Sequence, residues 1–154
     1  MMNTLKTTTA LLIASGMMIG SNAYAACGSS ETVFQCTTTN NKQIEVCDAG
    51  KTISYSFGKR GRKPELALSV PRHQATTFQW HGIGRHINYS VSIPNGAYTY
   101  TVYTSLDKLE RNEDKAFEAG VTVEKNQQHL ATVICRDHTV VDDIQGIDLK
   151  PTTW

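Results

Sequence analysis

The chain has 154 residues, of which 40% are hydrophobic and 19% charged, and its formal net charge is +1. This length corresponds to one ordinary domain after any leader is removed. A balanced charge lacks the basic footprint with which nucleic-acid-binding proteins hold phosphates. We therefore expect a single globular domain that does not bind nucleic acid.

Residues 1–25 have the pattern of a cleaved signal peptide. Lys6 is their only charged residue, an uncharged apolar run follows it, and Ala23-Tyr24-Ala25 is a small-x-small cleavage site. The run is too short for a transmembrane helix, so we expect no transmembrane segment. The mature chain, residues 26–154, carries 14 basic and 14 acidic residues and should be periplasmic or secreted. A lipid anchor on Cys27 is the alternative, although Tyr24 stands where a lipobox usually has Leu.

All four cysteines, Cys27, Cys36, Cys47 and Cys135, follow the signal peptide. An even number in an exported chain predicts two disulfides. If Asn40-Asn41-Lys42 is a three-residue turn, Cys36 and Cys47 point to opposite faces of a hairpin and are poorly placed to pair. We then prefer Cys36–Cys135 and Cys27–Cys47. A two-residue turn at Asn40-Asn41 would put Cys36 and Cys47 on one face, so the pairing stays open.

Short strand-like segments recur along the mature chain, with turn signals between them. The expected segments are Thr32–Thr39, Lys42–Asp48, Thr52–Phe57, Glu65–Val70, Thr76–His81, Ala119–Lys125 and Gln128–Arg136, followed by two short pieces, Thr139–Val141 and Ile144–Leu149, in a C-terminal extension of residues 138–154. A charged excursion at residues 106–117 is expected to hold a helical turn. This pattern predicts an all-β, antiparallel and disulfide-braced barrel or sandwich of about eight strands.

The clearest element is a hairpin at Asn95-Gly96, a dipeptide typical of a type I′ turn. With these two residues as the loop, Val91 lies opposite Tyr100, and the apolar side chains of both strands fall on one face. The serines and threonines fall on the other face. A one-residue slip would destroy this sorting, so the register is well specified.

The loop that leads into this hairpin is the candidate partner-binding surface. Gly82 and Gly84 permit a tight, protruding backbone, and Trp, Tyr and Arg are enriched in binding hot spots. A plain turn with Trp80 in the core is the alternative. The predicted partner-binding residues are Trp80, His81, Gly82, Gly84, Arg85, His86, Asn88 and Tyr89.

No pattern in the chain predicts catalysis or cofactor binding. A Gly-x-Ser-x-Gly motif and a phosphate-binding loop are absent, and the adjacent Asp142 and Asp143 would point to opposite faces of a strand. The five histidines lack metal-ligand spacing, although His81 and His86 could join a distant partner. We expect no enzyme activity, no cofactor and no metal.

Residues 58–64 form an expected turn with four positive charges, those of Lys59, Arg60, Arg62 and Lys63. The plain interpretation is a solvated hairpin tip. The alternative is a contact with an anionic partner such as lipopolysaccharide or an acidic protein surface.

The chain resembles the small periplasmic lysozyme inhibitors directed against c-type enzymes. Val33-Phe34-Gln35-Cys36 opens the mature domain like that family's aromatic-x-Cys opening, and Cys135 could pair with it. The segment Gly82–Tyr89 is similar in placement to the family's Ser-Gly-x-x-Tyr inhibitory loop, with His81 where the serine would be. The family's Trp-x-Lys-Gly signature is absent. The resemblance implies an eight-stranded antiparallel barrel.

The resemblance also implies a mechanism that is physical rather than chemical. The loop would enter the cleft of a peptidoglycan hydrolase, where Arg85 would pair with one of the two cleft carboxylates. Three alternatives remain open. The protein could be an immunity protein against a toxin delivered by a competing bacterium, an envelope module that binds glycan or protein without inhibiting it, or a metal-handling protein.

Overall fold

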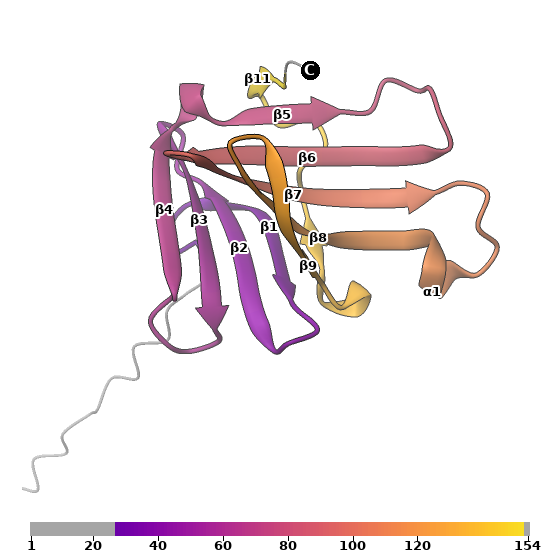
Figure 1. Cartoon of the computed structure of the whole chain (residues 1–154), viewed down its shortest axis with the longest axis horizontal. Coiled ribbons are helices and arrows are strands. Elements are labelled where there is room, and N and C mark those ends of the chain that lie inside the picture. Colours follow the sequence, from indigo (N-terminus) through magenta and orange to yellow (C-terminus); the bar gives the residue numbers. More distant parts are fainter. Residues whose placement is uncertain (1–26, 153–154) are drawn as a thin grey trace, which may run out of the picture.

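The computed structural model of the protein describes residues 27–152, so the predicted signal peptide lies outside the described part of the chain. Within that part, two β-sheets pack against each other, and their strands run across one another in Figure 1. The first sheet has the strand order β10-β1-β2-β3-β4, and the second has the order β11-β5-β6-β7-β8-β9. Neither sheet closes on itself. The all-β prediction is therefore confirmed, in its sandwich form rather than as a barrel.

Residues 27–152 contain eleven strands in these two sheets, against about eight predicted. Their bounds are β1 (Glu31–Thr37), β2 (Lys42–Asp48), β3 (Thr52–Lys59), β4 (Leu66–Pro71), β5 (Thr76–Gln79), β6 (His86–Asn95), β7 (Tyr98–Asp107), β8 (Phe117–Lys125), β9 (Gln128–Ile134), β10 (Val141–Asp142) and β11 (Lys150–Pro151). Every neighbouring pair is antiparallel except β11 with β5, which is parallel.

The core lies between the two sheets and follows the period-2 alternation of their strands. Tyr55 of β3 stacks on Tyr100 of β7 with ring centroids 5.2 Å apart, which joins the two layers. The other large buried side chains come from both sheets and include Phe34, Ile44, Val46, Ile53, Val91, Ile93, Val102 and Val121. Removal of these apolar groups from water is the main force that holds the layers together.

The β6–β7 hairpin forms as predicted, but its turn lies one residue further along the chain. Asn95 pairs with Tyr98, so the two-residue loop is Gly96-Ala97 and not Asn95-Gly96. Gly96 has a φ of 61°, and Ala97 has no positive φ, which matches a type II′ turn rather than the predicted type I′. Val91 consequently lies opposite Val102. The pairing differs from the prediction by two residues, and an even shift leaves every side chain on its predicted face.

The β1–β2 hairpin keeps a three-residue turn, but this turn lies one residue earlier in the chain than predicted. Cys36 lies opposite Ile44, and the backbone N–H of Thr38 donates to the carbonyl of Lys42 at 2.7 Å, so the turn spans residues 39–41. Asn41 takes the left-handed conformation that this turn requires, with a φ of 58°. The shift is again even, and Cys36 and Cys47 remain on opposite faces.

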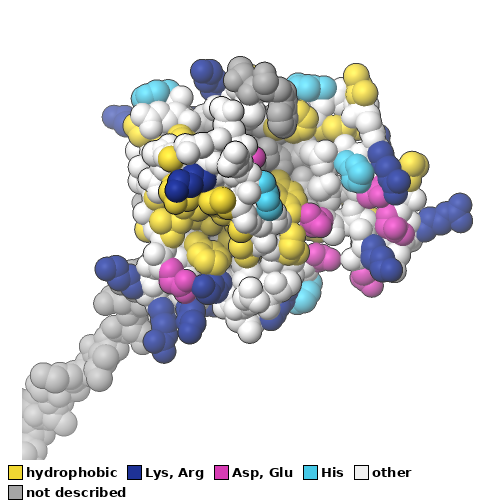
Figure 2. All heavy atoms as spheres, viewed as in Figure 1, with side chains coloured by type: hydrophobic (Ala, Val, Ile, Leu, Met, Phe, Trp, Pro, Cys, Tyr) yellow, Lys and Arg dark blue, Asp and Glu magenta, His cyan; other side chains and the backbone are white. Residues whose placement is uncertain are grey.

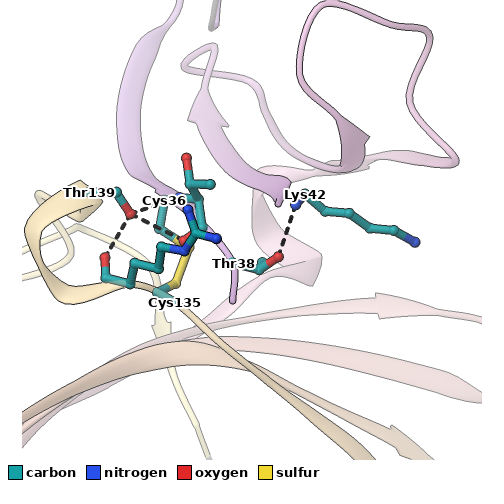
Figure 3. The surroundings of a disulfide bond; sticks show 7 residues. Cys36, Thr38, Lys42, Cys135 and Thr139 are labelled. Atoms are coloured by element: carbon teal, nitrogen blue, oxygen red, sulfur yellow. Dashed lines mark hydrogen bonds between the residues drawn. A yellow bond between two sulfur atoms is a disulfide. The ribbon is translucent and has the colours of Figure 1, made fainter. Parts of the chain in front are cut away.

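Both predicted disulfides are confirmed, Cys36–Cys135 and Cys27–Cys47. Figure 3 shows Cys36 from β1 bonded to Cys135, which follows β9, so this bridge links the two sheets. Next to it, Thr139 Oγ1 accepts from the N–H of Thr37 at 2.9 Å. The sulfur of Cys27 is bonded to Cys47, and one sulfur cannot also carry the thioether of a lipid anchor.

The C-terminal segment is part of the sandwich. The predicted strand Thr139–Val141 is replaced by a 3-10 turn, Asp137–Thr139, and by β10, which pairs with β1. The predicted strand Ile144–Leu149 is wrong. The N–H of Ile147 donates to the carbonyl of Ile144, and Gly146 turns the chain with a φ of 80°. Ile144 and Leu149 are buried between the sheets. The strand was predicted from the apolar residues of this segment alone.

The charged excursion contains the expected helical turn, α1 (Glu113–Ala116). Asn112 caps it, because its side-chain oxygen accepts from the N–H of Asp114 at 3.0 Å. The rest of the excursion is not helical, since Leu106 lies in β7 and Leu109 in the loop after it. No helix in residues 27–152 has the length and apolar character needed to cross a bilayer.

Candidate functional site

The predicted partner-binding loop, residues 80–85, connects β5 to β6 and projects at the right-hand end of the sandwich in Figure 1. The loop after β7, residues 108–112, lies beside it, since the N–H of Lys108 donates to the carbonyl of Arg85 at 3.1 Å. We call these two loops together the loop end. Gly82 and Gly84 have φ values of 88° and 97°, so the sharp path of the first loop depends on glycine at both positions.

Arg85 does not present a free guanidinium to a partner. Its Nε donates to Asp107 Oδ1 at 2.6 Å and its second terminal nitrogen donates to Oδ2 at 2.5 Å, a bidentate ion pair across the two loops. Asp107 Oδ1 also accepts from the N–H of Leu109 at 3.0 Å. The Arg85 hydrogen bond lowers the pKa of Asp107 to about 2, and the same bond raises the pKa of Arg85. The guanidinium of Arg85 is therefore already paired within the chain, contrary to the expectation that it pairs with a carboxylate of a partner.

Trp80 is also occupied within the chain. Its Nε1 donates to the carbonyl of Ile83 at 2.8 Å, which closes the loop on itself. Lys108 Nζ lies 4.8 Å from the centre of the Trp80 ring, a cation–π contact between the two loops. Trp80 therefore does not lie in the core, and the alternative prediction of a plain turn with a core Trp80 is wrong. Trp80, Arg85 and Asp107 instead form a frame that holds the loop in one shape.

The frame leaves apolar side chains exposed. Ile83, at the tip between the two glycines, is 86% exposed, and Leu109 on the neighbouring loop is 69% exposed. Leu106, at the end of β7, is 40% exposed. None of these three residues was among the predicted site residues, and neither were Asp107 and Lys108. The pairing of His86 with Asp107 in the β6–β7 register is what brings the second loop to the first.

The remaining predicted residues point in different directions. His86 is exposed, and its Nε2 lies 3.8 Å from Asp107 Oδ2. Asn88 lies next to Tyr89 on β6 and therefore faces the outer side of the sheet. The His81 ring makes an edge-to-face contact with Phe78, with ring centroids 6.2 Å apart.

Tyr89 faces the inner side of the sheet and lines a groove of about 310 Å³ beside the loop end. Ile87, Leu106 and Phe117 form its apolar walls, and Asp142 from the C-terminal segment lies at its edge. Thr104, Ser105 and Gln145 add further polar groups to its lining. A concave surface that combines apolar walls with polar groups is typical of a binding groove. The predicted residues thus divide between a projecting loop and an adjacent groove.

One group of side chains in residues 27–152 has metal-ligand spacing, namely Cys27, Glu45 and Cys47, with ligand atoms within 4.8 Å of one another. Both sulfurs belong to a disulfide, so neither is the thiolate that binds a metal. This group therefore gives no support to the metal-handling alternative.

Comparison with known proteins gives no family for this chain. No protein-family model matches it, and neither curated proteins nor solved structures contain a match.

Proposed function

We propose that this protein is an exported binding protein that holds a protein partner through its loop end. The observation that carries the proposal is Ile83, a large apolar side chain that is 86% exposed at the tip of a loop braced by Trp80 and by the Arg85–Asp107 ion pair. Two disulfides favour an oxidising compartment outside the cytoplasm.

A braced loop binds at lower entropic cost than a flexible one, because its shape does not have to be ordered on association. Exposed apolar residues rimmed by charged ones are typical of protein interaction surfaces. Ile83 and Leu109 have that setting, with Lys108 and the Arg85–Asp107 pair around them. The geometry favours insertion of the tip into a concave partner surface.

The narrower form of the proposal is inhibition of a lysozyme-type peptidoglycan hydrolase, with the tip in the substrate cleft. Because Arg85 is paired with Asp107, its role in this form is that of a positioning residue. Ile83 then makes the contact within the cleft. The resemblance to periplasmic lysozyme inhibitors and the projecting loop support this form.

A turbidity assay on peptidoglycan tests the narrower form, with mature protein added to several lysozyme types. We expect slower clearing with at least one of them. Ile83→Ser should weaken inhibition about tenfold or more, since burial of an isoleucine side chain contributes about 1.5–3 kcal/mol. Leu130→Ser is the matched control, because Leu130 is also exposed, at 53%, but lies on β9.

Wild type that is inert against every lysozyme type would refute the inhibitor form. Affinity capture from an envelope extract then tests the broader form. A captured protein that Ile83→Ser fails to retain supports a different partner, such as a delivered toxin. Equal capture by Ile83→Ser and Leu130→Ser would refute the loop end as the binding surface.

A further inference from the structure

An apolar groove lies at the edge of the second sheet, where β11 ends beside β5. Its volume is about 400 Å³, and Phe78, Ile147, Leu149 and Pro151 form its apolar walls. His81 lines it as well, in edge-to-face contact with Phe78. A cavity of about 150 Å³ already holds a benzene ring. The groove is therefore large enough for the bigger ring system of an indole.

The lining of this groove favours an uncharged occupant. No Lys, Arg, Asp or Glu of residues 27–152 lines it. Figure 2 shows Lys and Arg side chains at both ends of the molecule and acidic side chains mainly in the right-hand part of the face in view. The two polar side chains from β5 are already bonded within the chain. Thr77 donates to the carbonyl of Ser90 at 2.7 Å, and Gln79 donates to the carbonyl of Ile144 at 3.0 Å.

The chain itself reaches this groove at Thr152, which is part of the lining. β11 runs parallel to β5, and the N–H of Thr152 donates to the carbonyl of Thr77 at 2.8 Å. Thr152 Oγ1 donates to Thr76 Oγ1 at 3.2 Å, so Thr152 faces the same side of the sheet as Thr76. Phe78 shares that side, because side chains of a strand alternate. Trp154 follows Thr152 by two residues, so an extended chain turns it to the same side as Phe78.

We propose that Trp154 docks in this groove, with its indole ring against Phe78 and His81. Two residues span at most about 7 Å, so an extended chain beyond Thr152 keeps Trp154 beside β5. Aromatic rings in offset or edge-to-face contact stabilise one another beyond the area that they bury. The docked ring also covers the edge of β5 beyond the last residue of β11. This proposal does not depend on the partner proposed for the loop end.

The short connection favours Trp154 over a free ligand. A group that is attached through a short linker has an effective concentration in the millimolar range. A free apolar compound must therefore reach a similar concentration before it displaces the indole ring of Trp154. This competition makes the occupant of the groove measurable.

NMR spectroscopy of the mature protein tests the docking directly. We expect NOEs from the indole protons of Trp154 to the ring of Phe78 and to the methyl groups of Leu149. A mixture of isotope-labelled and unlabelled protein distinguishes contacts within one chain from contacts between chains. Absence of these NOEs overturns the proposal. NOEs that occur only between chains assign the groove to Trp154 of a second copy and overturn docking within the chain.

Added indole tests whether Trp154 fills the groove. In Trp154→Ala the groove is open, and indole should shift the methyl signals of Leu149. Wild type should need at least about tenfold more indole for the same shift, because its attached ring competes. Leu130→Ala is the matched control, since it removes an exposed apolar side chain from β9 and should respond to indole as wild type does. Equal responses of wild type and Trp154→Ala, or no response of either, overturn the proposal.

Two further substitutions separate the ring of Trp154 from its backbone. Trp154→Phe should respond to indole at concentrations between those for wild type and for Trp154→Ala, because the smaller ring still buries apolar surface against Phe78. Trp154→Gln should respond as Trp154→Ala does, since a polar amide gains little from an apolar groove. If Trp154→Gln excludes indole as strongly as wild type, the backbone and not the ring fills the groove, and the proposal is overturned.

Discussion

At the scale of single residues, the loop end depends on the pairing of Arg85 with Asp107. Arg85 was predicted to contact a partner from its local sequence, in which it lies between a glycine and a histidine. Its carboxylate partner is 22 residues away, and the β6–β7 register places it there by pairing His86 with Asp107. The ion pair converts Arg85 from a contact residue into a residue that positions Ile83.

Removal of this carboxylate should loosen the loop without unfolding the protein. In Asp107→Asn, the bidentate ion pair and its charge are lost, and we expect faster amide hydrogen exchange at residues 82–85 with an unchanged unfolding midpoint. Glu124→Gln, on β8, is the control and should leave the exchange of this loop as in wild type. Unchanged exchange in Asp107→Asn would mean that Trp80 and the glycines alone hold the loop.

The same pair gives a pH dependence. The pKa of Asp107 is lowered to about 2 from an ordinary value of 3.8, so the pair stabilises the loop at pH above about 3.8 and is lost as the pH falls through about 2. The NMR shift of the Arg85 Nε proton should therefore titrate with a midpoint near 2. A midpoint near 3.8 would show that the pair does not persist in solution.

At the scale of elements, the two predicted hairpins illustrate which property of a strand pair is robust. The apolar alternation of β6 and β7 was sufficient to assign faces, because the faces survive an even shift. It was insufficient to place the turn, since a loop at Asn95-Gly96 and one at Gly96-Ala97 both use Gly96. Backbone conformation at the turn distinguishes the two, with positive φ at Gly96 and not at Ala97.

Two substitutions separate these turns by their energetics. Gly96→Ala should destabilise the protein by about 1–2 kcal/mol, because a residue with a Cβ pays that cost at positive φ. Asn95→Ala should cost less than about 0.5 kcal/mol, since Asn95 is a strand residue paired with Tyr98. Urea unfolding measures both. Comparable losses in the two variants would favour the type I′ turn at Asn95-Gly96.

At the scale of the whole molecule, the Cys36–Cys135 bridge and the C-terminal segment add to the core in joining the sheets. Residues 141–142 pair with β1 in the first sheet, and residues 150–151 pair with β5 in the second. Between them, Gln79 of β5 donates to the carbonyl of Ile144 at 3.0 Å and accepts from the N–H of Gly146 at 2.8 Å. This segment therefore pairs with both sheets, and it places Asp142 at the groove that Tyr89 lines.

The two disulfides should contribute unequally to stability. Cys36 and Cys135 are separated by 99 residues and Cys27 and Cys47 by 20. In the chain-entropy model, the first bridge stabilises by about 4–5 kcal/mol and the second by about 3 kcal/mol. Denaturant unfolding of the paired alanine variants should reproduce this order. The opposite order would place the greater constraint at the N-terminal bridge.

Ile144 tests the packing of the C-terminal segment. Ile144 is fully buried, and Ile144→Ala should cost about 2–5 kcal/mol in unfolding free energy. Ile147→Ala is a suitable comparison, because Ile147 is only partly buried against the same core and should cost less. Equal and small losses would mean that the segment lies on the sandwich without holding it.

Local patterns were enough for the all-β class and for the faces of the β6–β7 hairpin, because alternation with period 2 is a property of neighbouring residues. They favoured the two disulfides but left the pairing open, because the directions of Cys36 and Cys47 depend on the length of the turn between them. The parallel pairing of β11, the burial of Ile144 and the Arg85–Asp107 pair were decided only in three dimensions. Each joins segments at least 20 residues apart, and no local pattern specifies which distant group fills a given space.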